Sequence, residues 1–200
     1  MRAWFAGLCA LAVGGTLGLD LLSERAGDWA PTHEASATTA VNLTLEELVE
    51  LSQTVAVVEA IERSSRWEEV GGSKRIVTYT KLVVHDTVTG TKQDEVWVRT
   101  LGGKVGKIGQ HVAGEAQFTI GGRAVVFLAK SGDAITIAGM AQGHYPLEEK
   151  DGVVRLKSSP DTGRLVDKRG PREPARAKLV GKTLGDATVS IQAAAKAIKK

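Results

Sequence analysis

Residues 101–122 read LGGKVGKIGQHVAGEAQFTIGG, a stretch with seven glycines among twenty-two residues. Strand-like runs flank it, EVWVR at residues 95–99 and AVVFLA at residues 124–129. Glycine tolerates positive φ angles and lets two backbones approach closely. We therefore predict that this glycine stretch bends tightly across the end of a β-structure, and that it is the core motif of a small exported β-domain.

The length and composition are those of one ordinary globular domain with appendages. The chain has 200 residues, of which 42% are hydrophobic and 24% are charged, which is enough to bury a core without disulfides or metals. Its single cysteine, Cys9, lies in an apolar run near the N-terminus. A mature chain without Cys9 has no disulfide, no cysteine nucleophile and no cysteine-based zinc site.

The N-terminus has the pattern of an export signal. Arg2 is followed by an uncharged run at residues 3–19, and the small residues at 35–37 would allow cleavage before Thr38. Leu8 directly before Cys9 does not fit a lipoprotein signal. We predict a signal peptide at residues 1–37, with an uncleaved anchor and flexible tether as the alternative. Both place the folded part outside the cytoplasm, as a periplasmic, envelope-associated or secreted protein.

A short helix opens the predicted folded region. Residues 44–47 read TLEE, a capping box in which Thr44 is the N-cap and Glu47 is at the third helical position. Leu43 can pack onto Leu48 across this cap as a hydrophobic staple. Leu45 and Leu48 then belong to an apolar stripe that we expect to pack against a sheet.

Short β-branched runs separated by turns follow this helix. We predict five strands, with a possible sixth, at residues 55–61, 75–85, 95–101, 123–130, 134–141 and 152–157. The run at residues 124–129 lacks polar alternation, which indicates a strand covered on both faces or one at the centre of a closed barrel. The predicted fold is mainly β, a small antiparallel OB-like barrel of five to six strands at residues 38–157, with a helix before it and a helix after it.

Residues 158–200 are predicted to be a basic linker and a closing helix. From Arg155 to the C-terminus there are 12 Lys and Arg against 4 Asp and Glu, whereas residues 38–150 have 12 against 14. A basic tail on an exported protein could bind anionic envelope polymers or lipid headgroups. No aromatic residues interleave with these cations, so nucleic acid is a poor partner. Contact with a membrane would need the tail or an uncleaved N-terminal segment.

The sequence contains no convincing catalytic, metal or cofactor motif. The triplet at residues 181–183 resembles the end of a phosphate-binding loop, but Arg176 stands where that loop needs a glycine. The glycine spacing at residues 103–109 lacks the following helix of a dinucleotide site. The four histidines share no metal-binding spacing, and no serine has the context of a catalytic triad. We predict no catalytic residue, no metal and no cofactor.

The order of the predicted elements resembles a known module. This order is similar to that of the netrin-like OB-fold module of the tissue inhibitors of metalloproteinases. It consists of a helix, VAVVEAI at residues 55–61, a long strand at 76–84, VWVR, the glycine turn and IGGRAVVFLA at 120–129. The motif GGKVGKIGQ at residues 102–110 also resembles exported bacterial proteins of unknown function. The animal inhibitors bind zinc through an N-terminal cysteine and carry disulfides, which this chain lacks. The resemblance therefore implies a fold and leaves the function open.

These observations predict an exported, non-enzymatic binding module whose partner is another exported protein or an anionic envelope polymer. The contact surface is expected at the glycine stretch and the neighbouring strand ends, because loops at a barrel mouth are where such folds bind. The candidate binding residues are Lys104, Lys107, Gln110, His111, Gln142 and His144. His111 and His144 in particular could converge in space. An accessory or inhibitory partner of an extracellular hydrolase, and an envelope-tethered structural protein that uses its basic tail, are the alternatives.

Overall fold

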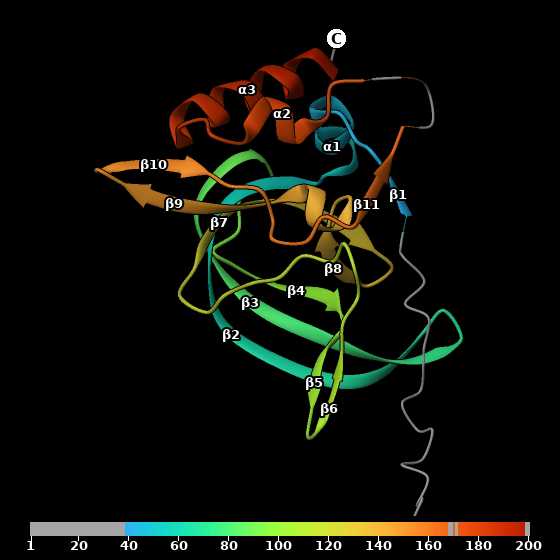
Figure 1. Ribbon diagram of the computed structural model, residues 1–200. Coiled ribbons are helices and arrows are strands. Elements are labelled where there is room, and N and C mark those ends of the chain that lie inside the picture. The colour runs from blue at the N-terminus through green and yellow to red at the C-terminus, as the bar shows by residue number, and fades with distance from the viewer. Residues whose placement is uncertain (1–38, 168–169, 171, 199–200) are drawn as a thin grey trace, which may run out of the picture. The chain divides into compact units, whose positions relative to one another are not determined.

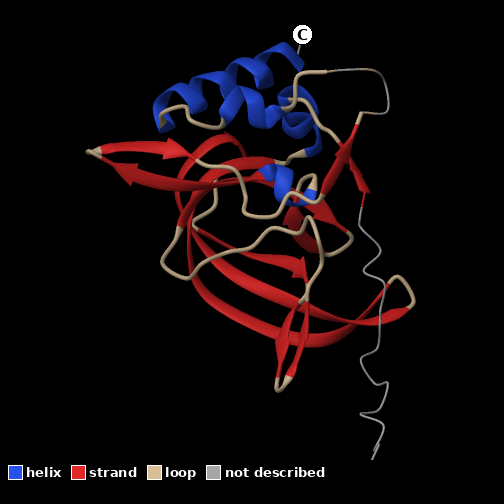
Figure 2. Ribbon diagram, in the orientation of Figure 1, coloured by secondary structure: helices blue, strands red, loops and turns tan. Residues whose placement is uncertain are grey.

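The computed structural model describes residues 39–167, 170 and 172–198. The predicted signal peptide or anchor, its cleavage site and Cys9 lie outside these residues. Within the described part the chain is mainly β, with three α-helices and one 3-10 helix (Figure 2). No helix in this part is long and apolar enough to cross a membrane.

The elements follow one another along the chain from β1 to α3 (Figure 1). The strands are β1 (Thr39–Val41), β2 (Thr54–Val70), β3 (Ser73–Gly90), β4 (Glu95–Leu101), β5 (Gly103–Val105), β6 (Ile108–Gln110), β7 (Arg123–Ser131), β8 (Ala134–Ile137), β9 (His144–Lys150), β10 (Val153–Leu156) and β11 (Arg164–Val166). The helices are α1 (Leu45–Leu51), η1 (Met140–Gly143), α2 (Ala175–Leu179) and α3 (Leu184–Ile198).

Seven strands form the main sheet in the order β10-β9-β7-β2-β3-β4-β8, and β8 also pairs with β7. Because β8 pairs with both β4 and β7, the strands β7, β2, β3, β4 and β8 form a closed ring of pairings. The prediction of five to six antiparallel strands is wrong in two respects. The sixth predicted strand is present as β10, but the unpredicted strand β9 joins it to β7, and β4 pairs with β8 in parallel at Val98 and Ile135. The parallel pair arises because the glycine stretch crosses over before β7, so that β8 runs in the same direction as β4.

Two apolar clusters lie on the two faces of the central strands. One cluster lies inside the ring of pairings and includes Leu82, Val98 and Val126. The other lies between the outer face of the sheet and the helices, and includes Val125 and Phe127. Strand β7 contributes alternate residues to both clusters, which confirms that it is covered on both faces. Each fully buried side chain of this size stabilises the fold by about 1.5–3 kcal/mol.

Helix α1 begins at the predicted capping box. The Thr44 hydroxyl accepts a hydrogen bond from the Glu47 N–H at 3.3 Å, and the Glu47 carboxylate accepts one from the Thr44 N–H at 3.0 Å. Leu45 and Leu48 are buried in the outer cluster, and Leu43 packs against it. The local sequence therefore fixes where this helix starts and which face it buries.

The C-terminal region is bound into the same structure. Strand β11 pairs in parallel with β1, and Lys178 and Arg172 form ion pairs with Glu46 and Glu47 of α1 at 2.9 and 2.7 Å. Leu179 and Ile191, from α2 and α3, lie in the outer cluster. Figure 1 shows the three helices together over one side of the sheet. The segment that we expected to be a linker thus contains a strand and a helix, β11 and α2, and α3 is the expected closing helix.

The glycine stretch turns where glycine is needed. Gly102 and Gly103 have φ angles of 87° and 129°, in the region that side chains disfavour. They bend the chain away from β4 into the small hairpin β5–β6, which the sequence did not predict. Residues 111–122 then cross from β6 to the start of β7, and so connect β4 to the strands that complete the ring.

Candidate functional site

A groove of about 830 Å³ opens where the glycine stretch crosses the inner face of β2, β3 and β4. Its lining contains hydroxyl, amide and charged side chains, several glycine backbones and the ring of Phe118. The residues that line it are Arg63, Ser65, Thr78, Thr80, Thr100, Leu101, Gly102, Gly103, Lys104, Gly109, Gln110, His111, Val112, Glu115, Ala116, Gln117, Phe118, Thr119 and Pro160. The volume is in the range of small-molecule and peptide sites.

The floor of the groove is a set of inward-facing hydroxyl groups. Strand alternation puts Thr78 on the same face as Leu82, so the inner face changes from apolar to polar along β3. The Thr78 hydroxyl donates to the Gly102 carbonyl at 2.6 Å and lies 2.8 Å from the Ser65 hydroxyl. The Thr100 hydroxyl lies 3.4 Å from the Thr78 carbonyl. These bonds hold the start of the glycine stretch against the sheet.

Gly103 is the point of closest approach. A Cβ atom at this position would overlap the Thr78 hydroxyl oxygen and come within 2.7 Å of the Ser65 hydroxyl oxygen. Gly103 also has a positive φ. The hairpin β5–β6 can therefore lie on the hydroxyl floor only because residue 103 has no side chain.

Glu115 is the one carboxyl group among the residues that line the groove. Burial raises its pKa to about 7, while hydrogen bonds from the N–H groups of Leu101 and Ala116 and the charge of Arg99 act in the opposite direction. The carboxyl thus satisfies a backbone donor at the end of β4. A carboxyl with a pKa near neutrality marks a candidate functional position, although its hydrogen bonds also explain it as part of the fold.

Four of the six predicted residues lie on or beside the hairpin. Lys104, Gln110 and His111 line the groove, and Lys107 lies exposed in the turn between β5 and β6. The Gln110 side-chain oxygen accepts a hydrogen bond from the Ile76 N–H at 2.7 Å, so this amide docks the hairpin onto β3. His111 is exposed, with its Nε2 3.1 Å from a carboxylate oxygen of Asp161.

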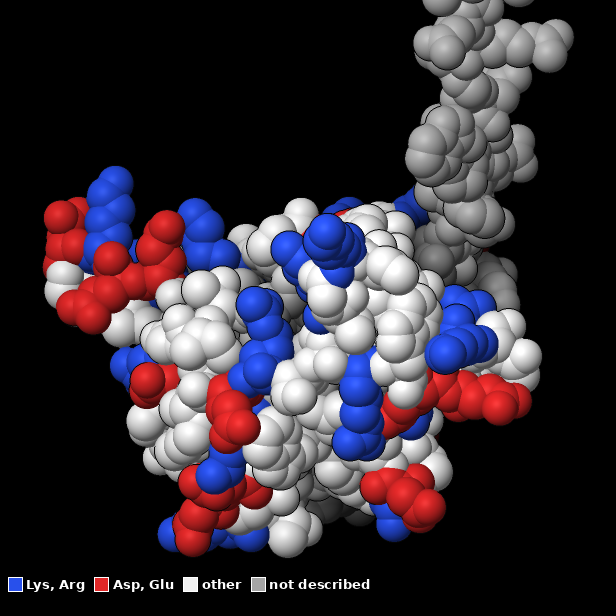
Figure 3. Space-filling model, turned by 90° about the horizontal axis from the view of Figure 1, so that it is seen from below, with Lys and Arg blue, Asp and Glu red and all other residues white. Residues whose placement is uncertain are grey.

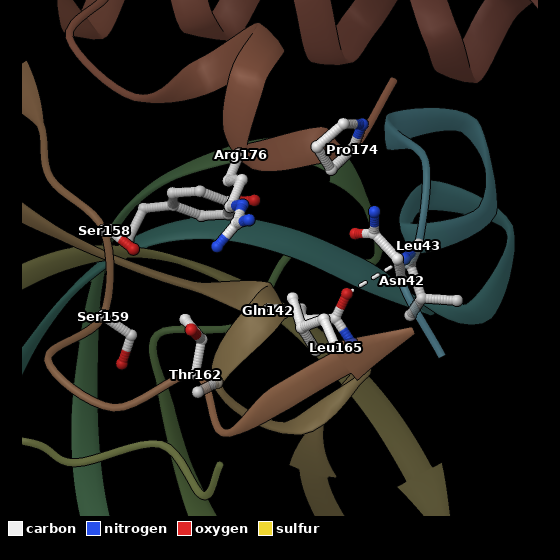
Figure 4. Close-up of a pocket in the computed structure, with 11 residues that line it drawn as sticks. Asn42, Leu43, Gln142, Ser158, Ser159, Thr162, Leu165, Pro174 and Arg176 are labelled. Carbon is white, nitrogen blue, oxygen red and sulfur yellow. Dashed lines mark hydrogen bonds between the residues drawn. The ribbon is translucent and has the colours of Figure 1, made fainter. Parts of the chain in front are cut away.

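Gln142 and His144 do not join that group. Gln142 accepts a bond from the Leu43 N–H at 2.9 Å, drawn in Figure 4, and donates one to the Val41 carbonyl at 3.0 Å. Its amide thus joins η1 to the start of the described chain. His144 is buried, and its Nδ1 lies 3.1 Å from the Ser159 hydroxyl.

Burial lowers the pKa of His144 to about 4, so the ring is neutral at pH 7. The ring packs against Phe118 in a tilted arrangement, with their centroids 4.7 Å apart and their planes at 56°. Because His144 is buried and His111 is exposed, the two rings do not share a solvent-exposed surface. The expectation of a shared recognition patch fails for this reason.

A second, much smaller cavity lies between η1, the segment at 158–165 and the start of α2 (Figure 4). Its volume of about 10 Å³ is comparable to that of one water molecule, which is too small for an organic ligand. Two buried atoms of residues that line it, Asn42 Oδ1 and Tyr145 OH, have no hydrogen-bond partner among the described residues. The larger groove is thus the better candidate for a ligand.

No protein-family model and no curated protein matches this chain. What the groove can do must therefore be argued from its residues alone. Within the described residues there is no group of His, Cys, Asp or Glu that could hold a metal ion. The Ser159–His144 hydrogen bond is the kind of contact that activates a serine, but both residues are buried.

The sequence did not point to the hydroxyl floor or to Glu115. A signal for the floor was present, since Thr78 and Thr80 alternate with Val77 and Tyr79 along β3. That alternation shows that one face of the strand carries hydroxyl groups, but not whether this face lies inside or outside. Glu115 had no local signal, because only the crossing of the glycine stretch brings it to the end of β4.

Proposed function

We propose that the chain is an exported, non-enzymatic binding module built on an OB-like barrel, and that its groove binds an extended segment of another exported protein. The ring of pairings supports the barrel. Numbered in chain order, its strands are β2, β3, β4, β7 and β8. They pair in the order 1-2-3-5-4 and back to 1, and the third and fifth strands are parallel. This is how a five-stranded Greek-key barrel closes.

The observation that carries the proposal is the groove beside a strand edge with no strand partner. Strand β2 pairs with β7 only from Thr54 to Glu59, whereas it pairs with β3 over its whole length. At Ala60 this other edge still bonds to the Gly122 carbonyl and the Gly121 N–H, and no described strand pairs with it beyond that residue. Arg63 and Ser65, which lie in this half of β2, line the groove. An extended peptide could add its backbone to such an edge and place alternate side chains in the groove.

The side chains of this region suit a peptide and disfavour self-association. Hydroxyl and amide groups at Thr80, Gln117 and Thr119 can bond to peptide groups, and the ring of Phe118 offers an apolar contact. The half of β2 with the open edge carries Glu62, Arg63, Arg66, Glu68 and Glu69. Charged residues on an edge strand keep it from pairing with a second copy.

A peptide library selected against the full chain tests the proposal. Gln117 is exposed and lines the groove, so Gln117→Trp should fill the space and weaken binding of a selected peptide about tenfold or more, measured by fluorescence polarisation. Lys107→Trp is the matched control, because Lys107 is exposed on the hairpin turn outside the groove. If no peptide is recovered, or if both variants bind like the parent chain, the groove is not a peptide site.

A further inference from the structure

The outer face of β2, β3 and β4 carries one exposed aromatic ring, Trp97, and one half-buried ring, Tyr79, next to paired charges. The register sets Glu62, Lys81 and Trp97 side by side across the three strands. Ser64, Tyr79 and Arg99 form the neighbouring row. Because side chains alternate along a strand, all six point away from the hydroxyl floor of the groove. Diagonal neighbours such as Tyr79 and Trp97 lie about 7–8 Å apart at their backbones.

Trp97 is exposed over 42% of its surface. Exposure of a large apolar ring to water is unfavourable, and a partner that covers the ring would remove this free-energy cost. Its flanks are polar: opposite it lies Lys81, whose Nζ forms an ion pair with Glu95 at 2.7 Å. The ring thus has an open apolar surface with hydrogen-bonding groups beside it.

Tyr79 is held in a closed network of side chains. The Arg66 guanidinium lies over its ring at 4.5 Å, and the same guanidinium pairs with Glu68 at 2.7 Å. The Tyr79 hydroxyl donates to Glu68 at 3.0 Å. Arg66 and Tyr79 lower the pKa of Glu68, so this carboxylate stays ionised as an acceptor. Together these contacts hold the Tyr79 ring, the guanidinium and the carboxylate in one arrangement on the surface.

Charges of both signs are interspersed on this face. Glu62, Glu68 and Glu95 lie among Arg66, Arg75, Lys81 and Arg99. Figure 3, seen from below relative to Figure 1, shows positive and negative side chains interspersed on the side of the molecule where β2, β3 and the hairpin β5–β6 lie. A polyanion such as nucleic acid or an acidic polymer favours a field of one sign. A protein partner favours an interface core depleted of charge.

We propose that this outer face, defined by Trp97, Tyr79, Arg66, Glu68, Lys81 and Arg99, binds a neutral glycan chain. The C–H face of a sugar ring is apolar and packs on an aromatic ring, while its hydroxyl groups take bonds from carboxylate and guanidinium groups. The rings supply the first contact and the ion pairs supply the second. The site is separate from the groove, since the two lie on opposite faces of the same strands.

Isothermal titration of the full chain with cellotetraose and chitotetraose, two neutral tetrasaccharides, tests this site. Trp97→Ala should weaken binding about tenfold or more, because a stacking contact is lost. Glu68→Gln should weaken it less, since it removes one charge of the network and keeps its shape. Trp67→Ala is the matched control: Trp67 is exposed over 38%, similar to Trp97, but its register places it on the opposite face.

Binding that Trp97→Ala reduces and Trp67→Ala leaves unchanged, with unaltered circular dichroism in both, would support the site. The absence of binding to either tetrasaccharide, or an equal loss in both tryptophan variants, would overturn it. So would binding to heparin alone that disappears in high salt, because this would indicate a field of positive charge. Dimerisation that Trp97→Ala abolishes would instead assign the face to a second copy of the chain.

Discussion

Replacing Gly103 with alanine should damage the fold far more than replacing another glycine of the same stretch. A side chain at φ of 129° is strained by about 1–3 kcal/mol. The new methyl group would also overlap the Thr78 hydroxyl, whose bond to the Gly102 carbonyl contributes about 0.5–1.5 kcal/mol. We expect Gly103→Ala to lower the free energy of unfolding by about 2–4 kcal/mol.

Gly106→Ala is the control for this change. Gly106 also has a positive φ, of 60°, but a Cβ atom there meets nothing within 4 Å. Only the strain remains, about 1–2 kcal/mol. Urea denaturation of the two variants and the parent chain, followed by circular dichroism, gives the comparison. Equal losses in the two variants would show that the close approach of Gly103 to the hydroxyl floor does not hold the hairpin in place.

Three further changes probe the site and its surroundings. Glu115→Gln should raise the free energy of unfolding at pH 8 by up to about 3 kcal/mol and leave it unchanged at pH 4. The folded chain binds the proton of the Glu115 carboxyl more tightly than the unfolded chain does, so the parent loses stability as the pH rises from about 4.5 through about 7. Urea denaturation in which the effect of the substitution is the same at both pH values would contradict this. Tyr145→Phe should be neutral or stabilising by up to about 1 kcal/mol in thermal unfolding, because the buried hydroxyl has no partner among the described residues, and a clear loss would mean that a buried water bonds to it. Gln110→Ala should lower the free energy of unfolding by about 1–3 kcal/mol because the Ile76 N–H loses its acceptor; we expect His111→Ala, at an exposed position, to change it by less than about 0.5 kcal/mol, and the reverse order would refute the docking role of Gln110.

Local patterns in the sequence predicted local structure well. The capping box at Thr44 and Glu47 is satisfied inside the helix itself, so no distant contact is needed to place it. The apolar run at residues 124–129 indicated burial on both faces, which the two clusters around β7 confirm. The glycines at 102 and 103 indicated a tight bend, and their φ angles show one.

Features that depend on distant pairing were not predicted. Alternation along a strand has two faces, and only the ring of pairings determines that Thr78 points inward and Tyr79 outward. In the same way, the sequence around Gln110 and Gln142 shows two polar amides without showing that each is used by a backbone group of another element. The predicted residues Lys104, Gln110 and His111 line the groove at the glycine stretch, whereas Gln142 and His144 bond within the fold.

The joining of β1 to β11 and of α1 to the C-terminal helices has a consequence for how the chain folds. Asn42 bonds to Asp167 across 125 positions, and Glu46 pairs with Lys178 across 132. Contacts at such separation form late, because the long intervening loop must be closed first. A nascent chain can therefore assemble its strand pairs but leaves the apolar outer face of β2 and β7 open until α3 has emerged. Docking of α3 is then the step that covers this face, and deletion of residues 184–198 should produce an aggregating chain rather than a smaller stable one.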